Sequence, residues 1–424
     1  MDEVVSMDAV IDAFRAFRRG LPERPRIYVA GCAGEPLLLA EAIKTEPALA
    51  SGVTFLGVWI PGVNTTDWAG CHPEARAETI FLSADLRTSF EAGRTAFLPL
   101  SYSQAAEWLH RTRIDGAIAV TAPAREGNLS LGIAADFTPI VLRRREVPAL
   151  ALATEAMPTA RRGPAFEKQR FRKIVCENVP LRTVEDAAPP PALLEVGRKV
   201  ASLIGEGDTL QFGLGRFQRA VLTALTNHCG LAIHSGMISE PVTELLDRGV
   251  LVSDRPAITT GVALGSSSLY ARAAKDEAIR FRSVDYTHAA QTLTDIPRFR
   301  AINAAIEVDL FGQVNGEFLG GKQVSGTGGM IDFSRGAALS QDGLSITALT
   351  STAKKGEVSR IVPRLSAPAL SLARHETGMV VTEHGCADLR MRTIDERAEA
   401  LIAIADPAHR PGLTDAWREL RSTL

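Results

Sequence analysis

The amino-acid sequence predicts an α/β protein with two domains and largely parallel sheets. Three observations lead to this prediction: the length of the chain, the alternation of short apolar runs with helical stretches, and a proline cluster near the middle. The chain has 424 residues. At about 150 residues per domain, this length corresponds to two or three domains. Strands that alternate with helices are typical of parallel sheets covered by helices.

In the N-terminal half, aliphatic runs of strand length alternate with helical stretches. Residues 26–30 (RIYVA) are expected to form the first strand, and residues 36–43 (PLLLAEAI) begin a helix after a glycine turn. Further strands are expected at 53–58, 116–120, 149–153 and 172–175. This alternation predicts a first α/β domain over residues 1–187.

The proline cluster marks the expected boundary between the domains. Residues 185–191 read EDAAPPP, and three consecutive prolines interrupt both helices and strands. Proline-rich segments also form semi-rigid spacers between domains. A local proline turn within one domain is the alternative interpretation.

The same alternation continues after the prolines. Helices are expected at 193–203, 217–225 and 240–247, and strands at 209–212, 231–234, 305–309, 345–349 and 379–381. Thr393 and Glu396 fit a capping box at the start of a further helix, and apolar residues then recur at helical spacing. These elements predict a second α/β domain over residues 192–424.

Composition and charge exclude several classes of protein. Apolar residues make up 46% of the chain, which excludes a disordered protein. The 47 basic and 49 acidic side chains leave a formal charge of −2, so we expect neither a nucleic-acid nor a membrane partner. The five cysteines are scattered and lack metal-ligand spacing, which argues against a zinc site or a disulfide framework. Without a signal segment or a long apolar run, the chain is expected to be a cytoplasmic protein that holds no metal.

Two glycine-rich segments are candidate ligand loops. Gly213 and Gly215 lie in QFGLG, between an expected strand and an expected helix, where backbone N–H groups attract negative charge. This segment fits a dinucleotide turn, an oxyanion loop or a plain turn. Gln218 occupies the position of the third glycine of a dinucleotide fingerprint, which disfavours a nicotinamide site. Residues 320–329 (GGKQVSGTGG) contain five glycines and form either an anion-binding loop or a structural hairpin.

Many further segments, in order, resemble the acetyl-CoA hydrolase/CoA-transferase family, which includes 4-hydroxybutyrate and succinyl-CoA:acetate CoA-transferases. The resemblance extends over nearly the whole chain. It rests on GCAGEP (31–36), EGNLSLGIAADF (126–137), DTLQFGLG (208–215), IEVDLFGQVN (306–315), VSGTGGMIDFSRGA (324–337), SRIVP (359–363), VVTEHGCADLR (380–390) and RAEALIAIADPAHR (397–410).

The resemblance implies two CoA-transferase-like open α/β domains, the second an acetyl-CoA hydrolase/transferase domain, with a CoA-ester site between them. It also implies covalent catalysis: a glutamate takes the CoA as a thioester, and a small carboxylic acid then collects it. No cofactor is permanently bound, because the coenzyme A ester is the substrate, and a homo-oligomer is expected. By resemblance, Gly213 and Gly215 line the reactive carbonyl, while Gly326, Gly328 and Gly329 cover the thioester. Lys354 falls where the family has a CoA-contacting lysine; a solvated lysine is the alternative.

The sequence departs from the family pattern at three positions. Gly236, in IHSGMIS, occupies the place of the nucleophilic glutamate, and glycine has no side chain that could form an anhydride. His288, in VDYTHA, stands where the family usually has asparagine. Arg216 follows the first glycine loop, where small or apolar residues are usual, and either binds a substrate carboxylate or faces solvent.

These departures predict an acyl-CoA enzyme that works by a non-standard route. In the first hypothesis, His288 activates water for acyl-CoA hydrolysis or C–C hydrolysis, because histidine titrates near neutral pH; the alternative is a structural, hydrogen-bonded histidine. In the second, another carboxylate such as Glu240, about one helical turn beyond Gly236, supports CoA transfer. In the third, the chain is a non-catalytic acyl-CoA-binding protein.

Overall fold

A computed structural model describes residues 7–185 and 187–424. Within these residues, contacts divide the chain into two compact units. The first unit contains residues up to 185 together with 259–287, and the second contains the remainder. The chain thus passes between the units at the proline-rich segment, but it contributes residues 259–287 of the expected C-terminal domain to the first unit. Independent domains at 1–187 and 192–424 stay a prediction.

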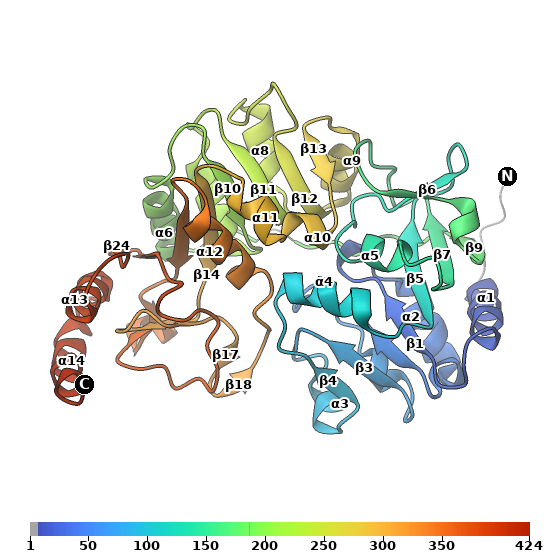
Figure 1. Ribbon diagram of the computed structural model, residues 1–424, viewed down its shortest axis with the longest axis horizontal. Coiled ribbons are helices and arrows are strands. Elements are labelled where there is room, and N and C mark those ends of the chain that lie inside the picture. The colour runs from blue at the N-terminus through green and yellow to red at the C-terminus, as the bar shows by residue number, and fades with distance from the viewer. Residues whose placement is uncertain (1–6, 186) are drawn as a thin grey trace. The chain divides into compact units, whose positions relative to one another are not determined.

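The first unit is built on a parallel sheet (Figure 1). Its strands lie in the order β4-β3-β2-β1-β5-β7-β9, and all neighbours are parallel. Every residue of β5 and β7 is buried, as expected for central parallel strands that are covered on both faces. The strand bounds are β1 Arg26–Val29, β2 Thr54–Leu56, β3 Arg76–Thr79, β4 Thr95–Phe97, β5 Gly116–Thr121, β7 Ala149–Thr154 and β9 Lys173–Glu177.

Helices and a small two-stranded sheet complete the N-terminal part of this unit. The helices are α1 Met7–Arg19, α2 Leu37–Thr45, α3 Arg87–Glu91, α4 Tyr102–Arg111 and α5 Thr138–Leu142. The strands β6 (Asn128–Ser130) and β8 (Ala165–Glu167) pair in antiparallel fashion. Ser101 and Gln104 form a capping box that starts α4.

Residues 259–287 belong to the first unit through backbone hydrogen bonds. The N–H groups of Ala263 and Phe281 donate to the carbonyls of Ile133 and Arg162, at 3.0 and 2.7 Å. The segment contains most of β12 (Ile258–Ala263), then α9 (Ser267–Lys275), β13 (Ile279–Phe281) and α10 (Val284–Thr287). Local sequence patterns do not show this exchange, because the partners lie more than a hundred residues apart.

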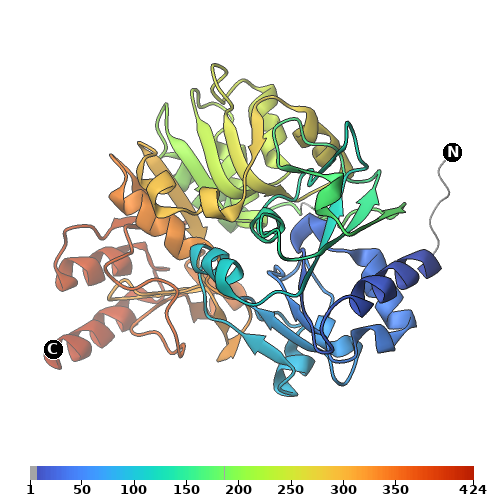
Figure 2. The ribbon, with the colours of Figure 1, turned by 45° about the vertical axis from the view of Figure 1, so that its right-hand side comes forward.

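The second unit contains strands in the order β11-β10-β14-β19-β23-β24. The yellow-green strands β10 and β11 lie side by side in Figure 2. The pairs from β11 to β23 are parallel, and β24 adds an antiparallel edge. The chain runs outward from β10 to β11 on one side and returns to β14 on the other, so strand order reverses at β10. In open α/β sheets, ligands bind at the carboxyl ends of strands at such a point. The bounds are β10 Thr209–Phe212, β11 Ala232–Ile238, β14 Phe299–Ala304, β19 Leu344–Ala348, β23 Met379–Thr382 and β24 Gly385–Asp388.

The α/β class with largely parallel sheets is therefore confirmed. The expected strand at 305–309 is displaced: β14 ends at Ala304, and β15 (Glu307–Asp309) pairs instead with β16 (Val314–Asn315) and β22 (Ile361–Val362) in a separate small sheet. The short hairpins are β17 (Phe318–Leu319) with β18 (Lys322–Gln323), and β20 (Thr352–Ala353) with β21 (Val358–Ser359).

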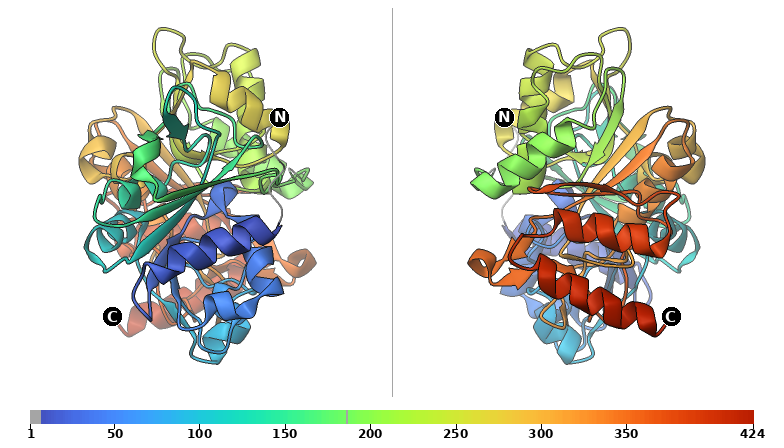
Figure 3. Two further views of the ribbon diagram at one scale, coloured as in Figure 1. Left: turned by 90° about the vertical axis from the view of Figure 1, so that its right-hand side faces the viewer. Right: turned by 90° about the vertical axis from the view of Figure 1, so that its left-hand side faces the viewer.

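Helices of the second unit pack on its sheets, and the expected capping box at Thr393 and Glu396 is present. They are α6 Pro191–Ala201, α7 Arg216–Ala224, α8 Pro241–Asp247, α11 Ala290–Thr294, α12 Met330–Leu339, α13 Ile394–Ile404 and α14 Arg410–Ser422. The last two lie side by side (Figure 3). No helix in the described ranges is long and apolar enough to cross a membrane.

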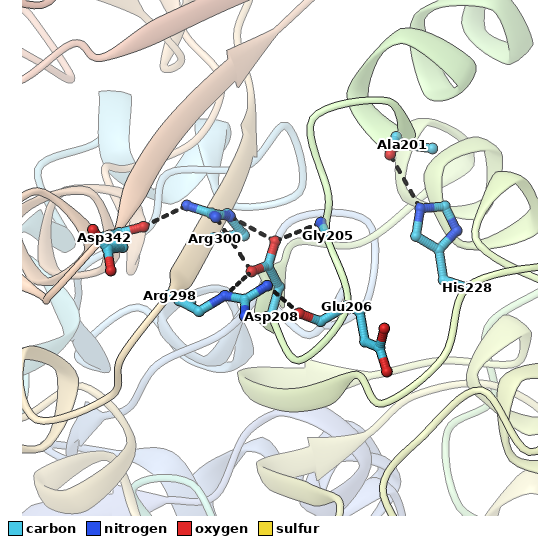
Figure 4. Close-up of polar contacts among 8 residues, drawn as sticks. All are labelled: Ala201, Gly205, Glu206, Asp208, His228, Arg298, Arg300 and Asp342. Atoms are coloured by element: carbon cyan, nitrogen blue, oxygen red, sulfur yellow. Dashed lines mark hydrogen bonds and ion pairs between the residues drawn. The ribbon is translucent and has the colours of Figure 1, made fainter.

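A buried carboxylate joins the starts of the central strands of the second unit. Asp208, just before β10, accepts hydrogen bonds from Arg298 Nε at 2.9 Å and from Arg300 Nε at 2.8 Å (Figure 4). The Gly205 N–H also donates to it, at 2.8 Å. Because both arginines precede or begin β14, this carboxylate holds the amino ends of β10 and β14 together.

Asp208→Ala is expected to lower the free energy of unfolding by about 3 kcal/mol, because it leaves two guanidinium groups without their buried partner. Urea denaturation measures this change. Asp415→Ala is the control, since Asp415 pairs with Arg418 on the exposed surface of α14 and its loss should change stability little. Equal losses in the two variants would contradict a structural role for Asp208.

Candidate active site

The glycine turn that follows β10 leaves its backbone accessible. Gly215 is the N-cap of α7 and has φ 94°, a left-handed conformation that favours glycine. Among the described residues, a Cβ added at Gly213 or Gly215 would meet no atom within 4 Å beyond its own residue and its chain neighbours. Ser235 of β11 donates its hydroxyl to the Phe212 carbonyl at 2.9 Å, which ties the end of β10 to the neighbouring strand. The turn therefore presents open backbone at the carboxyl edge of the sheet.

His288 fills the space beside Gly236. A Cβ placed on Gly236 would lie 2.9 Å from His288 Cε1 and 3.2 Å from His288 Nε2. Cβ atoms do not approach other heavy atoms below 3.0 Å without a shift of one partner. His288 is 2% exposed, and in the chain it follows α10 and precedes α11. The ring thus occupies the place that a side chain at position 236 would take.

The second glycine loop meets the same imidazole. Gly329, the N-cap of α12, would place a Cβ 2.6 Å from His288 Nε2. Phe333, one turn into α12, packs against the imidazole with ring centroids 4.4 Å apart. Gly236 and Gly329 are therefore both glycines at positions where a larger residue would collide with His288. The structure brings together three residues that the sequence singled out separately.

Burial keeps the His288 imidazole neutral. Desolvation, together with a smaller effect of the nearby His234, lowers the pKa of His288 to about 3. A neutral imidazole offers one N–H donor and one nitrogen lone pair. Because a general base works best with a pKa near the working pH, the ring in the free protein accepts a proton only weakly.

Glu317 anchors the loop that contains Gly326 and Gly328. Its Oε1 accepts hydrogen bonds from the hydroxyls of Thr327 and Ser371, each at 2.9 Å. Both glycines are buried, and Gly328 has φ 58°. Sequence reasoning missed Glu317, whose one signal is a carboxylate within the otherwise uncharged run VNGEFL. The bonds hold the loop in a defined position next to the start of α12.

The other predicted site residues follow the ends of strands. Arg216 is the exposed first residue of α7, and Glu240 is the partly buried N-cap of α8. Lys354 is exposed in the turn between β20 and β21, with φ 49°. The close approaches to His288 come from Gly236, Gly329 and Phe333. The roles of Arg216, Glu240 and Lys354 therefore stay predictions. Among the described residues, no group of three or more His, Cys, Asp or Glu side chains is placed to hold a metal ion.

The fold and the site define an open α/β protein in which a glycine of β11 and a glycine at the start of α12 meet a buried imidazole near the carboxyl edge of a parallel sheet. Residues 265–417 match the model of the acetyl-CoA hydrolase/transferase C-terminal domain. The chain is 31% identical over 430 residues to 4-hydroxybutyrate coenzyme A transferase of Clostridium kluyveri, covering 98% of this chain and 99% of that protein. The chain therefore belongs to the acetyl-CoA hydrolase/CoA-transferase family and is an enzyme of that family.

Solved structures agree with this assignment. RipA from Yersinia pestis superimposes with a TM-score of 0.89 at 26% identity, over 98% of this chain and 100% of that one. A 4-hydroxybutyrate CoA-transferase from Porphyromonas gingivalis superimposes with a TM-score of 0.79 at 28% identity, over 97% of each chain. Acetyl-CoA hydrolase of Kluyveromyces lactis is 29% identical over 216 residues, 49% of this chain and 40% of that protein.

Proposed function

We propose that this enzyme hydrolyses an acyl-CoA thioester without a glutamyl-CoA intermediate at position 236. The observation that carries the proposal is the contact between His288 and Gly236. Glycine offers no carboxylate, and the His288 ring occupies the space where one would stand. The name acetyl-CoA hydrolase within the family supports hydrolysis as a reaction class.

In the proposed reaction, a water molecule held by the imidazole attacks the thioester carbonyl. The water transfers one proton to the ring nitrogen, and its oxygen forms a bond to the carbonyl carbon. Backbone N–H groups of the glycine loops and the start of α12 stabilise the oxyanion. The oxyanion raises the pKa of His288 while it exists, so the ring holds the proton only during the reaction. Collapse breaks the C–S bond, the imidazolium protonates the thiolate, and a carboxylic acid and CoA leave. A 3-oxoacyl substrate attacked at its keto carbonyl would undergo C–C hydrolysis instead.

The remaining predicted residues bind the ester in this proposal. Gly213 and Gly215 approach the reacting carbonyl, and Gly326 and Gly328 cover the thioester. Lys354 meets a CoA phosphate or a pantetheine amide, and Arg216 meets a carboxylate on the acyl group or the product.

Thiol release without an acceptor acid tests the proposal. The purified protein is incubated with a panel of acyl-CoA esters, and free CoA is followed with a thiol-reactive dye. We expect steady release without any added carboxylic acid, and intact-mass spectra that show no CoA attached to the protein. Release that requires acetate or another acceptor would overturn hydrolysis as the main reaction.

CoA transfer is the second candidate, favoured by the transferase names of relatives that match nearly the whole chain. Glu240 follows β11 at the start of α8 and is its candidate carboxylate. In that case the mass spectrum would show a CoA adduct that disappears in Glu240→Gln. Tight binding of an ester with no turnover of any ester would instead identify a non-catalytic binding protein.

A further inference from the structure

Four positions form a row across the second-unit sheet at its carboxyl edge: Gly236, Gly213, Asn303 and Thr347. Leu210 pairs with Ile233. Gly213 and Gly236 each lie three residues further along the chain than these partners, so they are level with each other. Phe212 pairs with Ile302, which places Asn303 level with Gly213 on the other side. Asn303 itself pairs with Thr347 of β19. We call these four positions the edge row.

The edge-row residues share the sheet face that α12 covers. Residues level with one another in neighbouring parallel strands project to the same face. Phe299, Ala301 and Asn303 alternate along β14, and the first two pack in one apolar cluster with Phe333 of α12. The Cβ direction of Gly236 likewise points at His288 and Phe333. This face therefore changes from apolar under α12 to polar at the carboxyl edge.

An opening over Gly213 separates two polar groups. The imidazole of His288 lies over Gly236, and nothing lies within 4 Å of a Cβ placed on Gly213. On the far side, the amides of Asn303 and Gln211 exchange two hydrogen bonds, each at 3.4 Å. A ligand group in this opening would have the imidazole on one side and the Asn303 amide on the other.

The polar groups beyond the opening retain unused hydrogen-bonding capacity. Asn303 is 7% exposed. Its hydrogen bonds with Gln211 use one N–H and one lone pair, and among the described residues one of each is left on its amide. The Thr347 hydroxyl is buried and has no partner among the described residues. Buried polar groups lower stability unless they are hydrogen-bonded. An alkyl chain over Gly213 would leave these groups unpaired, whereas an oxygen atom there would pair with them.

We propose that the opening over Gly213 receives the acyl group of the CoA ester, and that this group carries a hydroxyl or keto oxygen at C3 that bonds the Asn303 amide. The inference rests on the proposed function, because His288 must face the thioester carbonyl. Gly236 and Asn303 are two strands apart, about 10 Å between backbones. The His288 imidazole lies beside Gly236 at one end of that gap, and the Asn303 amide lies at the other end. The C3 atom lies two bonds from the carbonyl carbon. One ester can therefore place its carbonyl near His288 and its C3 oxygen near the Asn303 amide.

Three esters of equal chain length test the inference: butyryl-CoA, 3-hydroxybutyryl-CoA and 3-oxobutyryl-CoA. We expect kcat/KM for at least one oxygenated ester to exceed that for butyryl-CoA by about 10-fold or more. Asn303→Leu should bring this ratio close to one, because it should lower kcat/KM for the oxygenated esters and leave kcat/KM for butyryl-CoA unchanged. Thr347→Val, which keeps the side-chain shape, should lower the ratio in the same direction.

Ser345→Ala is the matched control. Ser345 lies on β19, two residues before Thr347, and pairs with Ala301. Its hydroxyl is also buried. We expect Ser345→Ala to show the same ratio of kcat/KM, oxygenated ester over butyryl-CoA, as the unchanged protein. A ratio near one in the unchanged protein, or an unchanged ratio in both Asn303→Leu and Thr347→Val, would overturn the inference.

Calorimetric titration of the same three esters separates this inference from the proposed function. If no ester is turned over, hydrolysis is wrong, but the inference still requires tighter binding of an oxygenated ester than of butyryl-CoA. Turnover of butyryl-CoA at the best rate would support hydrolysis and overturn the inference.

Discussion

His288→Ala is expected to lower kcat/KM for acyl-CoA hydrolysis by about 10²- to 10⁴-fold, the range that a positioned acid–base group contributes. The substitution removes the imidazole that contacts Gly236 and Gly329 and leaves space beside both glycines. Steady-state thiol release measures the change. His288→Asn, which introduces the residue that the family resemblance predicts at this position, should be as inactive, because an amide does not accept the proton from water.

His228→Ala is the control for this loss. His228 belongs to the same unit, and its Nε2 is 3.2 Å from the Ala201 carbonyl. Figure 4 draws this contact. We expect His228→Ala to retain the activity of the unchanged protein. Full activity in His288→Ala would remove His288 from the reaction.

The low pKa of His288 also predicts how the stability of the protein depends on pH. With a pKa of about 3 when folded and about 6.5 when unfolded, the neutral ring is favoured in the folded state. Between these values the unfolded chain binds more protons, so stability falls as the pH falls below 6.5, by at most about 1.4 kcal/mol per pH unit. His288→Ala should therefore lose less stability than the unchanged protein between pH 7 and pH 5, as measured by urea denaturation.

Gly236→Glu combined with His288→Asn is expected to convert the enzyme to covalent CoA transfer. The double variant places a carboxylate at position 236 and removes the ring that a Cβ there would meet at 2.9 Å. Incubation with an acyl-CoA should then attach CoA to most of the protein, seen by intact mass, where the unchanged protein shows none. Thiol release should become dependent on an added carboxylic acid, with release in its absence lower by about 100-fold.

Two matched variants are the controls for this conversion. Gly236→Gln with His288→Asn has the same shape without the nucleophilic carboxylate and should form no adduct. Gly236→Glu alone should be destabilised, because its Cβ and the imidazole compete for one space. An adduct in the single variant with unchanged stability, or none in a folded double variant, would show that the imidazole does not occupy the nucleophile's place.

Local sequence patterns predicted much of the fold because they depend on residues that are near neighbours in the chain. The aliphatic runs became β1, β5 and β7, and the Thr393 capping box starts α13. Strand β14 was missed, since its run FRAINA mixes apolar, small and polar residues. The exchange of 259–287 into the first unit also escaped prediction, because its hydrogen bonds join residues distant in sequence.

The sequence by itself determined the α/β class and the family, and it singled out Gly236, Gly329 and His288 as candidate site residues. These conclusions need only residue types, spacing and motif order. The tertiary structure alone decided that the three residues meet, that the ring is buried enough to be neutral, and that Asn303 and Thr347 lie level with Gly213. Contacts between residues about 40 to 90 positions apart depend on how strands pair and helices pack, and no local pattern records that arrangement.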